Sequence, residues 1–454
     1  MRLFQVRELT EYPVGARRMW ILTMAVLAVL IGSYEAQIAP VVPLLLTDLH
    51  MSLATYGLVS AAGVLAGVFA SAIGGRLTDH VGRVRLLVPL TLFTAVCCFL
   101  MVLVHSATGL LLVRILLSIV DGMALAGTAP LVRDFSPRTG RAQAFGFWTW
   151  GPVGANFLAA AIASVTLPLF DNAWRSQFVI MGVFSLVISV VIMFNIADLA
   201  PELRARIQQT EQHAIGAAVV GSAPPRAREL LRHGNIWAHV IGISMWLVLY
   251  VTLSLFGQTM LADSFHLSVA TASGVMSAFW VLDLIVLIVI GRISDRLQVR
   301  KTLSVAGTVV SVVITGYLIL LMGRPDVSHL ELMITGALLG GALAVAYGPW
   351  MANYSEDAED IDPRLQGSAW GLYAALAKGV AVVTLFVIPT VVATLGWRAW
   401  MIIAGLCLVV FVPTVFAFHG PWRAHQGRPA LPAAWADDER SEPALLRPAG
   451  DANL

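Results

Sequence analysis

The sequence contains little charge. Only 12% of its 454 residues are charged, whereas about 25% are charged in an ordinary soluble domain. Hydrophobic residues make up 58% of the chain, and this composition excludes a water-soluble globule. The 29 basic and 27 acidic residues leave a net charge of +2, so the chain lacks the basic surplus that nucleic-acid binding requires.

Cysteine is also scarce, and motifs for catalysis are missing. Cys97, Cys98 and Cys407 all lie inside apolar runs, which excludes a disulfide framework and a thiolate metal site. The sequence has no nucleotide-binding glycine loop, no zinc-ligand spacing and no Ser/His/Asp constellation. It therefore predicts neither an enzyme, nor a cofactor, nor a pump driven by ATP.

Long apolar runs fill most of the chain. Each is about 20 residues or longer, the length that an α-helix needs to cross a hydrocarbon core about 30 Å thick. A membrane-spanning barrel would instead show segments of about ten residues with alternating polarity. We therefore predict an all-α membrane protein with twelve transmembrane helices, at residues 19–46, 56–76, 84–105, 107–132, 143–168, 176–197, 236–262, 271–292, 302–322, 329–352, 366–393 and 397–418.

The predicted helices fall into two groups of six. Two sequence patterns recur in both groups: Gly-Arg and a following Asp, at 75–79 and 291–295, and Trp-Arg, at 174–175 and 397–398. Such a repeat favours a solute site between two halves, near the middle of the membrane. The expected organisation is an N-terminal segment, a six-helix half, a polar linker, a second six-helix half and a disordered tail, at 1–18, 19–197, 198–235, 236–418 and 419–454.

The basic residues indicate the orientation. With the N-terminus inside, 24 of the 29 basic residues fall in segments on that side, and only Arg175, Arg324 and Arg398 fall in segments on the other. Basic segments stay on the cytoplasmic side of a membrane. We therefore predict a multi-pass protein of the cytoplasmic membrane with both termini inside. Four tryptophans near helix ends are expected in the interfacial belts: Trp20, Trp174, Trp397 and Trp400.

A motif rich in glycine and charge follows the second predicted helix. Its characteristic positions are Gly75, Asp79, Gly82, Arg83 and Arg85. A degenerate copy follows the eighth helix and keeps Gly291, Asp295 and Arg296, whereas Gln298 and Val299 stand in place of glycine and arginine. The motif resembles the best-known signature of the major facilitator superfamily, and the resemblance extends over the chain except for the tail.

The resemblance implies two six-helix halves that rock about a central site. It also implies that Asp79 faces the start of the eleventh helix, near Gln366, and helps to hold an inner gate shut. Helix 4 is similar to that of many members because Arg114 is followed by a glycine-rich stretch. A glycine-proline cluster in helix 5 resembles an antiporter signature in part, but Ala155 and Asn156 depart from it and weaken an assignment to export.

Five charged residues lie inside the predicted spans: Glu35, Arg114, Asp121, Asp283 and Lys378. A charge at the bilayer centre costs at least about 2.5–3.5 kcal/mol, so such groups usually face a partner or a proton path. We expect Glu35 to pair with Arg114, and Asp283 with Lys378. This arrangement leaves Asp121 without a cation and makes it the favoured proton carrier, with Glu35 and Asp283 as the other candidates. Arg114 and Lys378 are expected to bind the solute, together with polar and aromatic residues at similar depth: Gln37, Asn156, Tyr250, Gln258, Tyr347 and Tyr373.

The intramembrane cations favour an anionic solute. We therefore predict a bacterial secondary transporter, functional as a monomer, that takes up a small organic anion or similar metabolite together with protons. The alternative is efflux of amphipathic drugs in exchange for protons, which the aromatic content favours. A non-transporting membrane sensor is third, since a sensor would not need charges in its spans. The acidic run at residues 356–362 is expected either to meet Arg133, Arg138 and Arg141 or to form a solvated loop.

Overall fold

The computed structural model describes residues 7–135, 147–203, 227–324, 326–362 and 365–423. Its secondary structure is almost entirely helical. Within these ranges, eleven helices are long and apolar enough to cross a membrane. The last of them contains Gly396, whose φ of 80° and ψ of 170° are not helical, so it divides into two legs. The predicted all-α fold is confirmed, and the two legs account for the eleventh and twelfth predicted helices.

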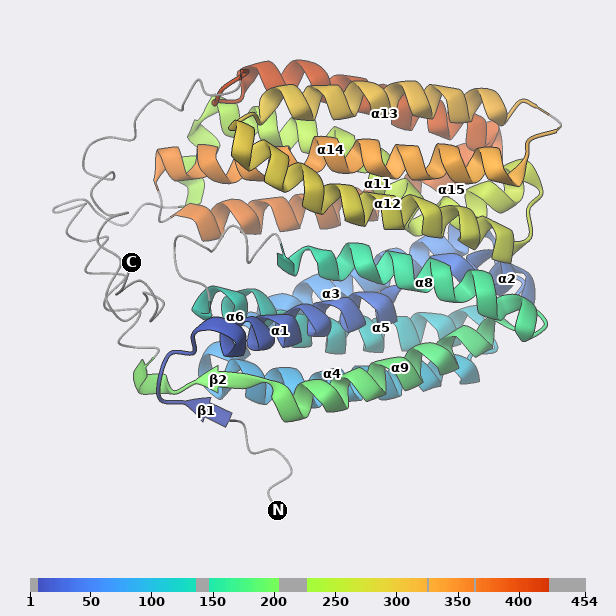
Figure 1. Cartoon of the computed structure of the whole chain (residues 1–454). Coiled ribbons are helices and arrows are strands. Elements are labelled where there is room, and N and C mark those ends of the chain that lie inside the picture. The colour runs from blue at the N-terminus through green and yellow to red at the C-terminus, as the bar shows by residue number, and fades with distance from the viewer. Residues whose placement is uncertain (1–6, 136–146, 204–226, 325, 363–364, 424–454) are drawn as a thin grey trace.

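The N-terminal helices form one bundle, the lower one in Figure 1. Proline residues break the first predicted span, because Pro40 and Pro43 stand at the starts of separate short helices. The helices are α1 (Gly15–Ala36), η1 (Ala39–Val41), α2 (Val42–Asp48), α3 (Leu53–Val81), α4 (Arg83–Leu100), η2 (Met101–Leu103), α5 (Ala107–Leu125), α6 (Thr128–Asp134), α8 (Trp150–Leu169) and α9 (Trp174–Asn195).

The C-terminal helices form the second bundle, the upper one in Figure 1. They are η4 (Ala227–Arg232), α11 (Gly234–Phe265), α12 (Val269–Leu297), α13 (Lys301–Leu321), α14 (His329–Ile361), α15 (Gln366–Thr414) and η6 (Val415–Ala417). The first leg of α15 covers residues 366–395 and the second covers 397–414. Each bundle buries its own apolar side chains, and a shared cluster joins the two.

Corresponding helix pairs in the two halves pack through glycine. A Cβ on Gly67 would lie 3.2 Å from the Ser118 carbonyl, where α3 meets α5. A Cβ on Gly341 would lie 3.3 Å from Leu282, where α14 meets α12. Small residues let helices approach closely where there is no water to drive their association. The two halves therefore share close helix packing through glycine as well as sequence motifs.

A short parallel sheet, which the sequence analysis did not predict, ties the two ends of the N-terminal half together. Strand β1 (Arg7–Leu9) pairs with β2 (Ala197–Leu199), with Leu9 opposite Leu199. The Asp198 carboxylate accepts a hydrogen bond from the backbone of Leu199 at 2.9 Å. Figure 1 shows both strands at one end of the bundle.

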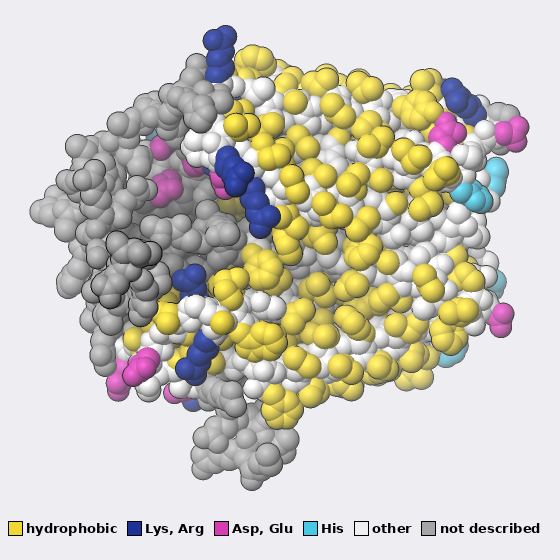
Figure 2. Space-filling model, in the orientation of Figure 1, with side chains coloured by type: hydrophobic (Ala, Val, Ile, Leu, Met, Phe, Trp, Pro, Cys, Tyr) yellow, Lys and Arg dark blue, Asp and Glu magenta, His cyan; other side chains and the backbone are white. Residues whose placement is uncertain are grey.

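The surface divides into a broad apolar band and two polar ends. In Figure 2, hydrophobic side chains cover the middle of the visible face, whereas charged and His side chains gather toward its two ends. The end that holds the sheet also carries Arg76, Arg83, Arg85 and Arg292, and we call it the basic end. The other end carries Arg175, Arg324 and Arg398, and we call it the opposite end.

The repeated Trp-Arg pairs lie at the opposite end in matching contacts. The Trp174 indole donates a hydrogen bond to Asp48 at 3.0 Å, and the Trp397 indole donates one to Asp263 at 2.9 Å. Trp400 is buried as well and donates to Thr252 at 3.1 Å. The prediction of an interfacial belt is therefore wrong for these three tryptophans, because their rings are buried and exposed aspartates of their own halves bind the first two indoles. Trp20 is 51% exposed.

Candidate functional site

The first motif copy joins the start of α4 to the end of α6. Gly82 has a φ of +103°, a backbone conformation that favours glycine, and it ends α3 immediately before Arg83. The buried Arg83 guanidinium donates to the Pro130 carbonyl at 2.6 Å and forms an ion pair with Asp134. Arg85 instead binds Glu8 of β1 at 2.7 Å. A Cβ on Gly75 would meet no atom within 4 Å.

The predicted contact of Asp79 with the start of the eleventh helix involves side chains outside the described residues. Asp79 falls within α3, but its side chain and that of Gln366 are not described. The role of Asp79 in an inner gate therefore stays a prediction.

In the second motif copy, a different arginine makes the equivalent contact between helices, and the sequence analysis missed it. Gln298 adopts a φ of +53° in the position of the glycine, and Arg300, one residue after the expected position, replaces the arginine. Arg300 binds Asp295 at 2.7 Å and Glu356 at 2.9 Å, which joins α12 to α14. Burial lowers the pKa of Arg300, but the carboxylates of Glu356 and Asp295 outweigh it, so the pKa is raised above its ordinary value. Gly291 has open space around it and Arg296 is exposed.

The acidic run is helical and not a solvated loop. Its residues 356–361 continue α14, and Glu356 and Asp357 contact other helices of this half. Glu356 binds Arg300, and the fully buried Asp357 accepts a hydrogen bond from His239 Nε2 at 2.9 Å. The backbone of His419 also donates to Asp357 at 3.0 Å. Arg138 and Arg141 lie outside the described residues, as does the side chain of Arg133.

The predicted pairing of Glu35 with Arg114 is wrong. Glu35 is 1% exposed and one of its carboxylate oxygens has no hydrogen-bond partner among the described residues. The Arg114 guanidinium donates to the Ala36 carbonyl at 3.0 Å, where α1 ends. The broken end of α1 leaves this carbonyl without a helical partner, and it satisfies Arg114 in place of the carboxylate.

The predicted pairing of Asp283 with Lys378 is wrong as well. Asp283 is 2% exposed and accepts a hydrogen bond from the Tyr250 hydroxyl at 3.1 Å. Lys378, on the first leg of α15, is exposed and interacts electrostatically with Asp121 of α5, in the other half. Asp121 also interacts with Arg114, so the expectation that Asp121 lacks a cation does not hold. Helix faces cannot be assigned from one sequence well enough to decide such pairings.

A column of stacked aromatic rings lies within the C-terminal half. Trp246 stacks on Tyr347 at 5.3 Å between ring centroids, and Trp350 stacks on Tyr354 at 5.4 Å with only 9° between planes. The hydroxyls of Tyr347 and Tyr373 lie 2.6 Å apart and link α14 to α15. Tyr250, Tyr347 and Tyr373 are each only partly buried.

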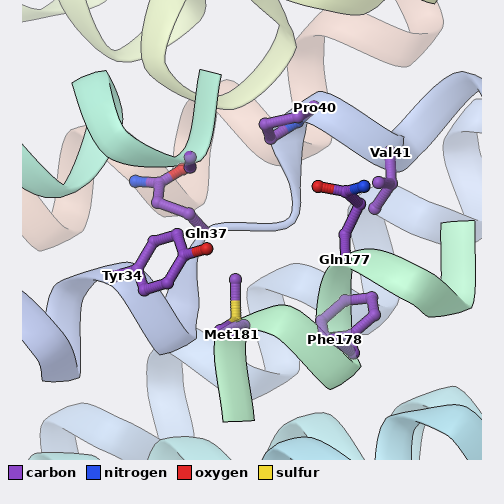
Figure 3. Close-up of a pocket in the computed structure, with 8 residues that line it drawn as sticks. Tyr34, Gln37, Pro40, Val41, Gln177, Phe178 and Met181 are labelled. Carbon is purple, nitrogen blue, oxygen red and sulfur yellow. The ribbon is translucent and has the colours of Figure 1, made fainter. Parts of the chain in front are cut away.

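The other predicted solute contacts are dispersed. Asn156 of α8 accepts a hydrogen bond from Ser254 of α11 at 3.3 Å, across the two halves. Gln258 is 3% exposed. Gln37 lines a small pocket with Tyr34, Gln177 and other residues, all from the N-terminal half (Figure 3). This pocket is separate from Lys378, and the structure brings together only part of the predicted set.

The two halves contact each other at the opposite end. The rings of Tyr56 and Phe256 meet edge to face at 5.9 Å. A Cβ on Gly57 would lie 3.2 Å from Pro389 of α15, and one on Gly274 would lie 3.9 Å from the Cβ of Ser164. At the basic end, by contrast, a Cβ built on Gly75, Gly291 or Gly371 would have no described atom within 4 Å.

Relatives of this chain include a transporter and a drug-resistance protein. A "Gallate transporter" of Pseudomonas putida is 23% identical over 319 residues, which cover 65% of this chain and 69% of the relative. The "Quinolone resistance protein NorA" of Staphylococcus aureus (strain Mu50 / ATCC 700699) is 30% identical over 110 residues, which cover 24% of this chain and only 28% of that protein.

Solved structures share the fold at low sequence identity. A D-xylose-proton symporter superposes with a TM-score of 0.68 at 16% identity, covering 88% of this chain and 97% of the other. A bacterial homolog of the human lysosomal transporter Spinster, in an inward-facing and occupied conformation, gives a TM-score of 0.66 at 14% identity, with 89% and 97% covered. The family model for the Major Facilitator Superfamily matches residues 19–385. This chain is therefore a multi-pass membrane protein that belongs to the major facilitator superfamily of transporters.

Proposed function

We propose that the protein carries a small organic anion across a bacterial cytoplasmic membrane together with protons, with its basic end and both termini in the cytoplasm. One observation carries the proposal: an exposed cation, Lys378, lies on the first leg of α15, which packs through Leu385 and Pro389 against Gly57 of α3 in the other half. Asp121 is the proton carrier in this proposal. A lysine and a carboxylate placed between two moving halves provide an anion site and a proton site together.

The proposed transport cycle alternates the access to Lys378. Contacts such as Tyr56 with Phe256 join the halves at the opposite end. In the proposed cycle this conformation is the one in which the solute reaches Lys378 from the basic end. Rocking the halves would break these contacts and expose Lys378 to the other side. A carboxylate beside Lys378 gains a charge-assisted hydrogen bond, and the hydroxyls of Tyr347 and Tyr373 supply neutral ones.

The gallate transporter of Pseudomonas putida supports an anionic, and specifically an aromatic, solute. Gallate is a carboxylate on an aromatic ring. The partly buried rings of Tyr347 and Tyr373 offer aromatic surface, and aromatic pairs gain about 0.5–1.5 kcal/mol beyond the area that they bury.

Transport into liposomes tests the proposal. Purified protein is reconstituted with an alkaline interior, and accumulation of radiolabelled gallate, benzoate and lactate is measured after dilution into acidic buffer. We expect at least one acid to accumulate, and Lys378→Gln to reduce its apparent affinity about tenfold or more, because a hydrogen bond to a charged group contributes about 1.5–3 kcal/mol. Arg324→Gln, a loss of charge at the opposite end, is the control. Equal loss in both variants would contradict the role of Lys378.

A second function, efflux of amphipathic drugs in exchange for protons, is favoured by the aromatic column and by the partial match to NorA. The same liposomes distinguish it, because a cationic dye such as ethidium would then move against the proton gradient. Lys378 disfavours this function, since its charge repels a cationic solute. Dye transport that is insensitive to carboxylates would replace the first proposal by the second.

A further inference from the structure

The chain folds back onto the C-terminal half after its last helix. Residues 418–422 follow η6 and lie against the basic-end termini of α11, α13 and α14, and we call them the clasp. The Phe418 ring is 3% exposed and stacks on the His239 ring of α11, with 3.6 Å between centroids and 14° between planes. The His419 N–H donates to the Asp357 carboxylate of α14 at 3.0 Å. The clasp is therefore part of the packed C-terminal half.

The start of α13 fastens both ends of the clasp. The Lys301 ammonium donates to the Phe418 carbonyl at 2.8 Å and lies 4.6 Å from the centre of the Trp422 ring. The neighbouring Thr302 hydroxyl donates to the Trp422 carbonyl. Because Lys301 is only 5% exposed, the carbonyl and the ring of the clasp take the place of water around a buried charge.

His239 links the clasp to the column of aromatic rings. Its ring meets those of Trp350 and Tyr354 edge to face, at centroid distances of 6.2 and 5.3 Å. Trp350 stacks in turn on Tyr347, with 5.7 Å between centroids and 26° between planes. Ring contacts therefore run without a break from the clasp to Tyr347, whose hydroxyl lies 2.6 Å from that of Tyr373.

The clasp itself lies away from the proposed solute contacts. At a rise of 1.5 Å per residue, Asp357, which binds the clasp, is about 15 Å from Tyr347 along α14. Phe418 is thus too far away to touch a solute held by Tyr347. Its influence would pass through the rings, because close-packed side chains have no free space in which to absorb a shift. Withdrawal of the Phe418 ring would uncover one face of His239 and allow the rings stacked beyond it to move.

We propose that Phe418 is a positioning residue for the solute site: docked on His239, the clasp holds the ring column in the arrangement that binds the solute. This inference rests on the proposed function, because it takes Tyr347 and Tyr373 as solute contacts. Coupling between two sites is reciprocal, so the bound solute must in turn favour the docked clasp. Release of the clasp at the basic end then weakens binding although no solute contact is altered.

Binding to the purified full-length protein tests the effect of the clasp on the site. Gallate, benzoate and lactate are titrated calorimetrically in detergent. We expect Phe418→Ala to raise the Kd of the acid that binds about tenfold, within the range of about 5- to 150-fold that is typical of allosteric coupling. Phe416→Ala is the matched control, because its ring is 68% exposed and the substitution leaves Phe418 on His239.

A second clasp variant avoids a cavity in the core. Lys301→Met removes the hydrogen bond to Phe418 and the contact with Trp422, but it keeps an apolar side chain of similar length in the buried position. Replacing a buried charge by a well-packed apolar side chain is often neutral for stability. We expect Lys301→Met to raise the Kd in the same direction as Phe418→Ala.

Amide hydrogen exchange tests the reverse effect in the unmodified chain. The His419 N–H exchanges only when its hydrogen bond to Asp357 opens, so exchange in peptides that cover the clasp reports its docking. A saturating concentration of the acid should slow this exchange several-fold. In Phe418→Ala the same peptides should exchange fast both with and without the acid.

Other results would overturn the inference. An unchanged Kd in Phe418→Ala with fast clasp exchange would show that the clasp does not position the site, and so would clasp exchange that is the same with and without bound acid. An equal rise of the Kd in Phe416→Ala would remove the stacked ring as the cause. If Phe418→Ala does not fold, Lys301→Met decides by the same criteria. If no carboxylate binds the unmodified protein, the proposed function fails, and ethidium titrated into the same variants decides the role of the clasp.

Discussion

Arg83 and Arg85 belong to the same motif but have different surroundings. Arg83 and Asp134 keep only 10% of each side chain exposed, whereas Arg85 and Glu8 keep 58% and 39% exposed. A buried charge that loses its partner is costly, and an exposed ion pair contributes little because water and salt screen it. The motif thus combines one structural joint with one weak surface contact.

Substitution of the two arginines should therefore give unequal losses. We expect Arg83→Ala to lower the free energy of unfolding by about 3–5 kcal/mol, because Asp134 is left without its buried partner. Arg85→Ala should cost about 1 kcal/mol or less. Thermal or chemical unfolding of both variants in the same detergent measures the difference. Similar losses would show that Arg83 does not carry the joint between α4 and α6.

At this scale the sequence predicted residue types better than partners. The motif identified Gly82, whose backbone has the positive φ that the turn needs, but Arg300 was missed because it stands one residue beyond the expected position. The five intramembrane charges were found, yet both predicted pairings were wrong. Packing across the bundle decides which face of a helix meets which neighbour. A single sequence does not show which residues of different helices lie close together.

At the scale of elements, apolar runs predicted the helices and missed what lies at their ends. The runs of about 20 residues correspond to long helices because each must satisfy its own backbone hydrogen bonds in lipid. The breaks at Pro40 and Pro43, the extension of α14 to Ile361 and the strands β1 and β2 were not predicted. These features occur at helix ends and beyond them, where water and neighbouring segments compete as partners.

Gly396 divides α15, and its backbone is the reason that a glycine stands there. The combination of φ 80° and ψ 170° is essentially restricted to glycine. We expect Gly396→Ala to destabilise the protein by about 1–3 kcal/mol, visible as a lower melting temperature in detergent. Gly379→Ala is the matched control, because Gly379 lies within the helical first leg with nothing within 4 Å, and alanine there should be neutral or stabilising by about 0.5–1 kcal/mol. A larger loss of stability in Gly379→Ala than in Gly396→Ala would show that the backbone of Gly396 does not require glycine.

At the scale of the whole molecule, the contact between α8 and α12 should govern the exchange between access states. A Cβ on Gly274 would lie 3.9 Å from the Cβ of Ser164, a separation typical of disulfides. Oxidised Ser164→Cys/Gly274→Cys protein, in a background without Cys97, Cys98 and Cys407, should lose transport in liposomes and regain it on reduction. Each single cysteine variant serves as the control. Full activity of the oxidised, cross-linked protein would show that the opposite end does not open during transport.

The orientation of the molecule can be tested in the same cysteine-free background. We expect Asp326→Cys, at the opposite end, to react with an impermeant maleimide in intact cells, and Gln298→Cys, at the basic end, to react only after the cells are opened. Both positions are exposed, so access to the reagent depends on the side of the membrane. Labelling of position 298 in intact cells would reverse the proposed topology.

The pairing of β1 with β2 has a consequence for biosynthesis. A ribosome completes Arg7–Leu9 long before it reaches Ala197–Leu199, and at about 5–20 residues per second the interval is roughly 10–40 s. During that interval the first strand has no partner, although several of the helices between the strands have already been made. The sheet between β1 and β2 can therefore form only after the sixth helix of the N-terminal half has been made. Its formation marks the completion of that half.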